Sequence, residues 1–234
     1  MAADPMWPRR VRLLWHALVV GTSERVVDDD GVVRIGSVLF ALIRPTDGHD
    51  RAFNHWYERD HFYTTAAAAP GVFSAARFIE PAQRLHLALY FVLPGFDEAR
   101  EAFAVDQMVA AREDDRLFTE REHLHTWTYS VESASAGPGG VPPALVLDRR
   151  YASVAVGWAD ADAPRPDADV VLVLRTAAPV MPSAWDEGID PTQRRMVVAF
   201  GDALDGDPFA DLAGYHWSAR FEPAVVGTDT HVPD

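Results

Sequence analysis

Residues 53–79 read FNHWYERDHFYTTAAAAPGVFSAARFI and predict a polar-aromatic helix that runs into a Pro-Gly stop and then into a strand. The helix is expected from about Arg51 to Ala69. Pro70 ends it because proline has no N–H to donate, and Gly71 supplies the permissive backbone that often follows a helix. This stretch therefore carries most of the information about fold and function.

The predicted helix brings its reactive side chains to one face. Phe53, Tyr57 and His61 are spaced by four residues, so a phenol and an imidazole share a surface. The loop before the helix holds Asp47 and Asp50, whose carboxylates are expected to cap free amides of the first turn.

This pattern resembles the EthD-like branch of the dimeric α+β barrel superfamily, which reads roughly F-N-x-W-Y-x-x-x-H, then P-G-V and S-A-x-R-F. The matching residues are Phe53, Asn54, Trp56, Tyr57, His61, Pro70, Gly71, Val72, Ser74, Ala75, Arg77 and Phe78. The resemblance covers about residues 36–132. It implies a fold more than an activity, because the superfamily includes cofactor-free monooxygenases, polyketide cyclases, isomerases, haem-degrading enzymes and proteins without assigned chemistry.

The neighbouring segments support that fold. Residues 36–44, 72–80, 84–93 and 123–131 read as strands, and residues 96–112 carry apolar side chains at helical spacing. The resulting order βαββαβ is that of the ferredoxin-like unit. The predicted fold class is α+β, a ferredoxin-like dimeric α+β barrel made of two tandem ferredoxin-like units, of which the second is degenerate.

The chain of 234 residues has room for a second unit. We expect an N-terminal hairpin strand plus the EthD-like unit over residues 1–133, a Gly- and Pro-rich linker over 134–143, and the second unit over 144–234. The segments SAARFIEP at 74–81 and SARFEP at 218–223 echo each other. A lid or dimerisation module is the other interpretation of the second half.

One active pocket is expected, in the N-terminal unit. Trp185 stands where Trp56 would in a repeat, but Asp190 and Pro191 break the helix soon after, and the second half has no counterpart of His61. Whether the barrel closes within one chain or in a homodimer is left open.

Composition excludes several classes of partner. With 21 basic and 35 acidic residues, the net charge of −14 repels nucleic acid and anionic membranes. No segment approaches the roughly 20 apolar residues of a membrane span, so a soluble globular protein is expected. The absence of cysteine excludes disulfides, thiolate catalysis and cysteine-based metal sites.

The N-terminal residues 7–24 place arginines before an apolar run, as a signal peptide does. His16 interrupts that run and no small-x-small cleavage site follows, so a strand is the preferred interpretation. Residues 28–31 then form the turn of a hairpin, and the cytoplasm is the default location.

His61 is the main catalytic candidate, because an imidazole titrates near neutrality and a neighbouring phenol can orient it or stabilise an oxyanion. The competing interpretation is a structural histidine bonded to backbone. Tyr57 and Trp56 have a similar alternative, since aromatic residues at helical spacing usually belong to a core.

The third and fourth strands add further candidates. By strand alternation, His86 and Tyr90 share one face, and His123, His125 and Trp127 share another. If these faces lie opposite the helices, the barrel interior holds several imidazoles and aromatic rings, which suits a flat, partly phenolic substrate. The alternative is that they fill the barrel as half-polar packing.

No metal or cofactor is predicted. His123-x-His125 has the spacing of two ligands on one strand, but two ligands do not make a site and no further ligand stands at a suitable spacing. Haem through an axial histidine, which occurs in the superfamily, is not favoured either. A Gly-rich phosphate loop after a strand and a G-x-S-x-G elbow are both absent.

We therefore predict a cofactor-independent enzyme that acts on a hydrophobic aromatic or polyketide-derived substrate by proton abstraction, giving cyclisation, isomerisation or oxygenation. The catalytic candidates are His61, His86 and Tyr57, and the substrate-binding candidates are Trp56, Arg77, Tyr90, His125 and Trp127. The alternative is a non-catalytic module that sequesters an aromatic metabolite or supports an oxygenase partner.

Overall fold

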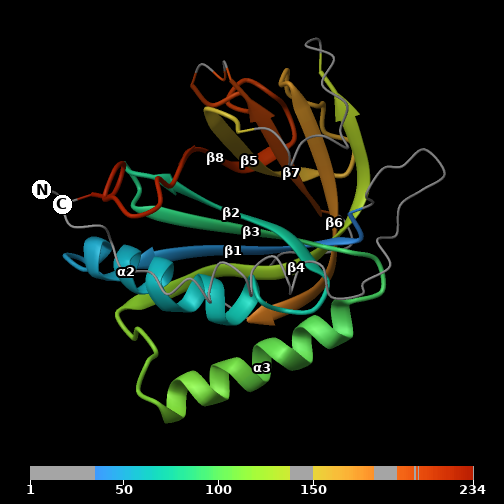
Figure 1. The fold of residues 1–234 in the computed structure, drawn as a ribbon. Coiled ribbons are helices and arrows are strands. Elements are labelled where there is room, and N and C mark those ends of the chain that lie inside the picture. The colour runs from blue at the N-terminus through green and yellow to red at the C-terminus, as the bar shows by residue number, and fades with distance from the viewer. Residues whose placement is uncertain (1–34, 138–149, 182–193, 203, 205, 234) are drawn as a thin grey trace, which may run out of the picture.

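The computed structural model describes residues 35–137, 150–181, 194–202, 204 and 206–233, which form a closed barrel of antiparallel strands with helices on one side (Figure 1). Around the barrel the strand order is β1-β3-β2-β8-β5-β7-β6-β4. The strands are β1 (Ser37–Pro45), β2 (Val72–Glu80), β3 (Leu85–Val92), β4 (Arg121–Ala136), β5 (Ser153–Asp160), β6 (Val170–Met181), β7 (Arg194–Gly201) and β8 (Tyr215–Pro223).

The helices belong to the first half of the barrel. The α2 helix (Asp50–Trp56) continues directly into η1 (Tyr57–Ala66), which has the wider π-helical form, and α3 (Asp97–Glu113) connects β3 to β4. The element order of this half confirms the predicted βαββαβ arrangement. Figure 1 shows the helices lying against the outer face of the sheet formed by β1 to β4.

The second half completes the barrel with β5 to β8. Its strands lie in the order β8-β5-β7-β6, and the strands of the first half lie in the corresponding order β4-β1-β3-β2. The halves join where β4 pairs with β6 along ten residue positions and where β2 pairs with β8 at two. Residues 151–158, 169–175 and 214–223 read as strands in the sequence and correspond to β5, β6 and β8, whereas the sequence did not predict β7.

The barrel interior is filled with side chains. Alternate residues of every strand point inward, because successive side chains of a strand face opposite sides of the sheet. The interior cluster includes Phe40, Leu87, Trp127, Val156, Leu172, Val198 and Phe221. A second apolar layer lies outside the barrel, between its first half and the helices, and includes Leu39, Ile43, Phe53, Tyr57, Ala88 and Tyr90.

Two local predictions are corrected. No carboxylate caps α2: the N-cap residue is His49, which makes no capping bond, and the buried Asp50 instead accepts hydrogen bonds from Arg84, with Nε 3.0 Å from Oδ2. The expected single α-helix over 51–69 changes form at Tyr57 and ends at Ala66. Gly71 does adopt the expected left-handed backbone, with φ of 76°.

The other sequence predictions concern the linker, the N-terminal strand and the segment around Trp185, and the structure describes only part of these segments. β4 continues to Ala136, so the first residues of the predicted linker are strand. The N-terminal strand, most of that linker and the segment around Trp185 lie outside the described residues. Within the described residues, no helix combines the length and apolar character needed to cross a membrane.

Candidate functional site between η1 and the sheet

The predicted site residues divide between two layers of the molecule. Trp56, Tyr57 and His61 come from the helices and lie in the outer layer, where Tyr90 of β3 meets them. His125 and Trp127 lie in the barrel interior, with their rings stacked 5.3 Å apart. The structure therefore does not bring all of these residues together, and only the outer layer brings candidate catalytic groups together.

A β-bulge separates the two histidines of β4. Ile43 pairs with His123, whereas its neighbour Leu42 pairs with His125, so one residue is skipped between them. Ile43 belongs to the helix-facing layer and Leu42 to the interior, and each histidine follows its partner. The prediction that His123 and His125 share a face is wrong. The described residues contain no group of three or more metal-ligating side chains either.

The π-helical form of η1 determines the setting of His61. In an α-helix, residues five apart point about 140° away from each other, whereas the i→i+5 pattern of a π-helix brings them onto one side. Trp56 and His61 are five apart, and their rings stack with centroids 4.5 Å apart and planes at 18°. Tyr57 meets the same imidazole edge-on at 5.0 Å. The rare π geometry thus places His61 between two aromatic rings.

His61 is uncharged in this setting. Burial lowers its pKa to about 3, and the positive charges of Arg121 and Arg77 contribute further. Its Nδ1 lies 3.1 Å from Thr65 Oγ1, and in the described part of the chain no hydrogen bond engages Nε2. The side chain keeps some exposure to solvent. When the hydrogen of the neutral ring is on Nδ1 and is donated to Thr65 Oγ1, Nε2 has the free lone pair that can accept a proton from a ligand.

Tyr57 and Tyr90 form a buried pair of phenols whose oxygens lie 2.9 Å apart. Burial raises the pKa of both, so both stay protonated near neutral pH. One hydroxyl donates to the other, and the second hydrogen remains to be donated. The Arg77 guanidinium lies 4.6 Å above the Tyr57 ring. The group can thus offer hydrogen bonds and positive charge to an oxyanion.

Arg77 is held by acidic and amide side chains of the helix. Its Nη1 lies 3.2 Å from Glu58 Oε1, and Nη2 donates to Asn54 Oδ1 at 3.0 Å. Both partners are tied in turn to the C-terminal segment, residues 224–233. Gly227 N–H donates to Glu58 Oε2 at 2.9 Å, and Asn54 Nδ2 donates to the Thr228 carbonyl at 3.1 Å.

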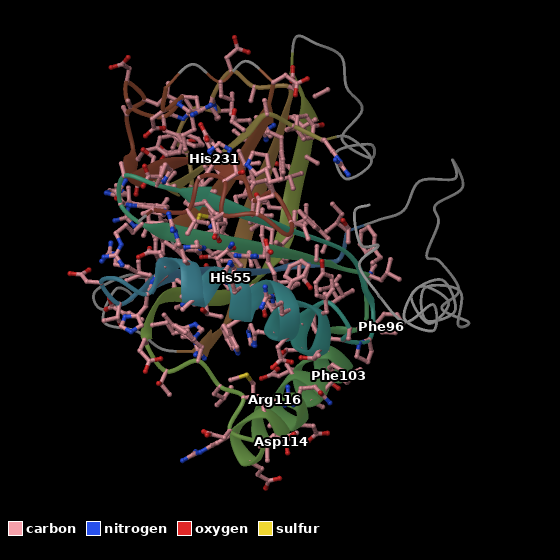
Figure 2. All side chains as sticks on the ribbon, turned by 60° about the vertical axis from the view of Figure 1, so that its left-hand side comes forward. His55, Phe96, Phe103, Asp114, Arg116 and His231 are labelled. Carbon is pink, nitrogen blue, oxygen red and sulfur yellow. The ribbon has the colours of Figure 1, made fainter. Side chains whose placement is uncertain are left out.

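The start of β4 and the end of α3 enclose the other side of Trp56. Arg121 lies 4.8 Å above the Trp56 ring, and the indole N–H donates to the Arg116 carbonyl at 2.7 Å. Arg116 also forms an ion pair with Asp60 of η1, in which Nη1 donates to both carboxylate oxygens, and Figure 2 shows it beside Asp114 at the end of α3. These contacts fix the wall of the site opposite the sheet.

His86 is on β3 and lies under α2, whereas His61 belongs to η1. The His86 side chain is 3 % exposed and meets the Phe53 ring at 4.8 Å, and both ring nitrogens lack a hydrogen-bond partner in the described structure. Burial lowers its pKa to about 3. A catalytic role for His86 stays a prediction, and it would require α2 to move.

His125 forms part of the barrel core. The side chain is fully buried, and its Nε2 lies 2.6 Å from the Tyr129 hydroxyl. Phe40, Trp127 and Trp158 surround its ring. Substrate binding by His125 and Trp127 stays a prediction, but the contacts found are those of packing.

Sequence patterns did not identify every residue of the site in the outer layer. Arg121, Glu58 and Thr65 carry no motif, and they join the site through the bulge in β4 and the π-helix, neither of which has a sequence signature. A pocket of about 70 Å³ lies where the end of β4 meets the second half of the barrel; its lining includes Glu132, Arg165 and Arg195 and does not include His61.

Comparison with protein-family models and with curated proteins finds no match. Among solved structures, the chain is similar to one described as an anthrone oxidase-like protein, with a TM-score of 0.50 and 12% sequence identity. The likeness covers 83% of this chain and 95% of the other. At this identity it shows a shared α+β barrel fold and nothing finer.

Proposed function

We propose that the chain is a cofactor-independent enzyme that abstracts a proton from a hydrophobic aromatic or polyketide-derived substrate at His61. The observation that carries the proposal is the position of a neutral, partly exposed imidazole between Trp56 and Tyr57, surrounded by the positive charges of Arg77 and Arg121. Aromatic walls suit a flat substrate, and the cations suit the anion that remains after deprotonation.

The low pKa of His61 makes it a weak base by itself. A substrate anion beside the new imidazolium changes that balance, because opposite charges in a poorly solvated site favour the charged form of both groups. Arg77, Arg121 and the Tyr57–Tyr90 hydroxyl pair stabilise the same anion. The driving force for proton transfer is thus the stabilisation of the enolate or phenolate rather than the basicity of the free imidazole.

In the proposed step, a C–H or O–H bond of the substrate breaks, the proton moves to His61 Nε2, and the electron pair stays on the substrate as an enolate or phenolate. Attack of the carbanion on an internal carbonyl, followed by loss of water, gives cyclisation. Reaction with dioxygen instead places one oxygen atom on the carbon as a carbonyl and releases the other as water. The similar structure described as anthrone oxidase-like is the reason to test oxygenation first.

The test compares wild type, His61→Gln and the control His216→Gln, whose exposed side chain lies on β8 in the second half. Each is incubated with anthrones, naphthols and poly-β-ketone mimics, with and without oxygen, and products are identified by mass spectrometry. We expect turnover by wild type and by His216→Gln, and a loss of at least about 100-fold in His61→Gln, the low end for a general base. Equal turnover by all three proteins excludes His61 as the base.

One observation favours the alternative of a binding or assembly module. Trp56 covers a face of the His61 imidazole, Tyr57 covers an edge, and Thr65 bonds Nδ1, which is also how a structural histidine is held. A module of this kind would bind the same aromatics with equal affinity in wild type and His61→Gln and convert none of them.

We also propose that residues 144–234 are a degenerate ferredoxin-like repeat of residues 1–133, joined by the predicted linker 134–143, of which residues 134–136 belong to β4. The corresponding strand orders of the two halves support it, as does the absence of helices between the strands of the second half in its described residues. A homodimer and a cytoplasmic location remain predictions, and analytical ultracentrifugation tests the first.

A further inference from the structure

The helix-facing side of β4 carries an unusual row of polar side chains. Thr126 and Thr128 pair with Ala41 and Leu39 of β1, which belong to the outer layer, so both threonines face the helices together with His123. Both threonines are buried. The row begins beside the His61 site and runs along the strand toward α3.

Arg100 of α3 reaches this row as a buried cation. Its side chain is 2 % exposed, and Nη2 donates to Thr128 Oγ1 at 2.9 Å. Nε has no hydrogen-bond partner, and within the described chain no carboxylate lies within the 4.0 Å of an ion pair. The carboxylates of Asp97 and Glu101 favour the charged guanidinium from farther away, and Asp97 itself accepts a hydrogen bond from Ser37. A buried, unpaired charge is costly, and an anion at this place would compensate it.

The hydrogen bonds along the row leave donors rather than acceptors. Arg121 Nε donates to His123 Nε2 at 3.1 Å, so in the neutral ring Nδ1 carries the hydrogen and donates to Thr126 Oγ1, also at 3.1 Å. Thr128 Oγ1 likewise accepts from Arg100. Each threonine hydroxyl therefore keeps its own hydrogen to donate.

Three donors thus line a short stretch: the two hydroxyls and Arg100 Nε. The threonines are two residues apart on one strand, a separation of about 7 Å. Because the chain as a whole carries a net charge of −14, this concentration of donors and unpaired positive charge is local and not a consequence of composition.

We propose that Arg100, Thr126 and Thr128 bind the carboxylate of an extended aromatic acid whose ring system lies against Trp56 and His61. The inference rests on the proposed function and specifies its substrate class. A singly charged carboxylate matches one guanidinium and neutral hydroxyls better than a phosphate dianion does. The β1 residues opposite His123 and Thr128 are four positions apart, a distance of about 13 Å, so the ligand is polycyclic rather than a single ring.

The experiment measures binding of 2-anthracenecarboxylate and of its uncharged analogue 2-anthracenecarboxamide to the full chain, by fluorescence titration. Wild type is expected to prefer the carboxylate by about tenfold or more, the range of one charge-assisted hydrogen bond. Arg100→Gln should reduce that preference to within about twofold, and Arg112→Gln, an exposed arginine of the same helix, should leave it unchanged.

Thr128→Val is the second variant, because it keeps the shape of the side chain and removes only the hydroxyl. It should lower the preference about threefold, the lower end for one neutral hydrogen bond, and thermal unfolding curves establish that each variant is folded. The proposal is overturned if wild type shows no preference for the carboxylate, or if Arg100→Gln is folded and keeps that preference. Displacement of the carboxylate by equimolar inorganic phosphate overturns the assignment to a carboxylate.

Failure of this inference and failure of the proposed function give different results. If neutral anthrones are turned over in a His61-dependent way but the carboxylate preference is absent, the carboxylate site is wrong and the enzyme proposal stands. If the preference is present and depends on Arg100 but nothing is turned over, the binding site stands and the catalytic role of His61 is wrong.

Discussion

The buried ion pair between Glu58 and Arg77 is the contact whose contribution to stability can be worked out most directly from the structure. Both side chains are nearly enclosed, with 9 % and 8 % exposure, and the pair lies 3.2 Å apart beside the Tyr57 ring. Glu58→Gln keeps the size of the side chain and an oxygen that can accept from Gly227 N–H. What is lost is the negative charge next to a buried guanidinium.

The expected cost is about 3 kcal/mol in the free energy of unfolding. Removing one member of a buried pair costs about 3–5 kcal/mol, because the other charge is left unpaired in a poorly solvated place. The lower end applies here, since Arg77 keeps its hydrogen bond to Asn54 and its contact with Tyr57. For a chain of this length, about 3 kcal/mol lowers the melting temperature by about 6–12 °C.

Urea and thermal unfolding of wild type, Glu58→Gln and Asp60→Asn measure this cost. Asp60→Asn removes the same charge from the same helix. Its ion pair with Arg116 is more exposed, at 27 % for Asp60 and 36 % for Arg116, so only a small effect on stability is expected. In the double variant Glu58→Gln with Arg77→Met, at least half of the lost stability should return, because no charge is left buried. Equal losses in Glu58→Gln and Asp60→Asn would refute the reasoning.

Three further predictions concern stability. Burial lowers the pKa of His86 to about 3, so between about pH 6.5 and 3 only the unfolded chain binds a proton at this side chain. The free energy of unfolding should therefore fall by about 2 kcal/mol on acidification to pH 5. Urea unfolding of His86→Phe at pH 7 and 5 should lack this loss. Gly71→Ala should cost at least about 1 kcal/mol more than Gly48→Ala in chemical unfolding, because both have positive φ but only the Cβ at Gly71 would meet the Phe96 side chain. Tyr129→Phe should lower the free energy of unfolding by about 1 kcal/mol by removing the hydroxyl bonded in the core; an unchanged value would contradict the bond.

The local elements of the first half could be predicted closely from the sequence. β2 spans the predicted residues 72–80, and β3 and α3 differ from prediction by about one residue at each end, because alternation and helical spacing are local patterns. β7 has the same alternation, with Met196, Val198 and Phe200 turned into the barrel, but the run is short and begins with two arginines.

The change from α-helix to π-helix at Tyr57 could not be predicted in this way. The two forms use the same residues and differ in which carbonyl each N–H contacts, and that choice depends on tertiary packing. Here Trp56 is fixed by its bond to the Arg116 carbonyl and by the Arg121 guanidinium, both from outside the helix. The stacking of Trp56 on His61 therefore depends on residues about 60 positions away in sequence.

The bulge in β4 has the larger consequence for function, because it decides which histidine belongs to which layer. With regular alternation, His123 and His125 would both enter the barrel, and the outer layer would have no imidazole on β4. The skipped residue turns His123 toward the helices, where it accepts from Arg121 and donates to Thr126. This direction of the hydrogen bonds leaves the hydroxyl hydrogen of Thr126 free to be donated to an anion. Restoring regular alternation would remove the imidazole link that joins the His61 site to the row leading to Arg100.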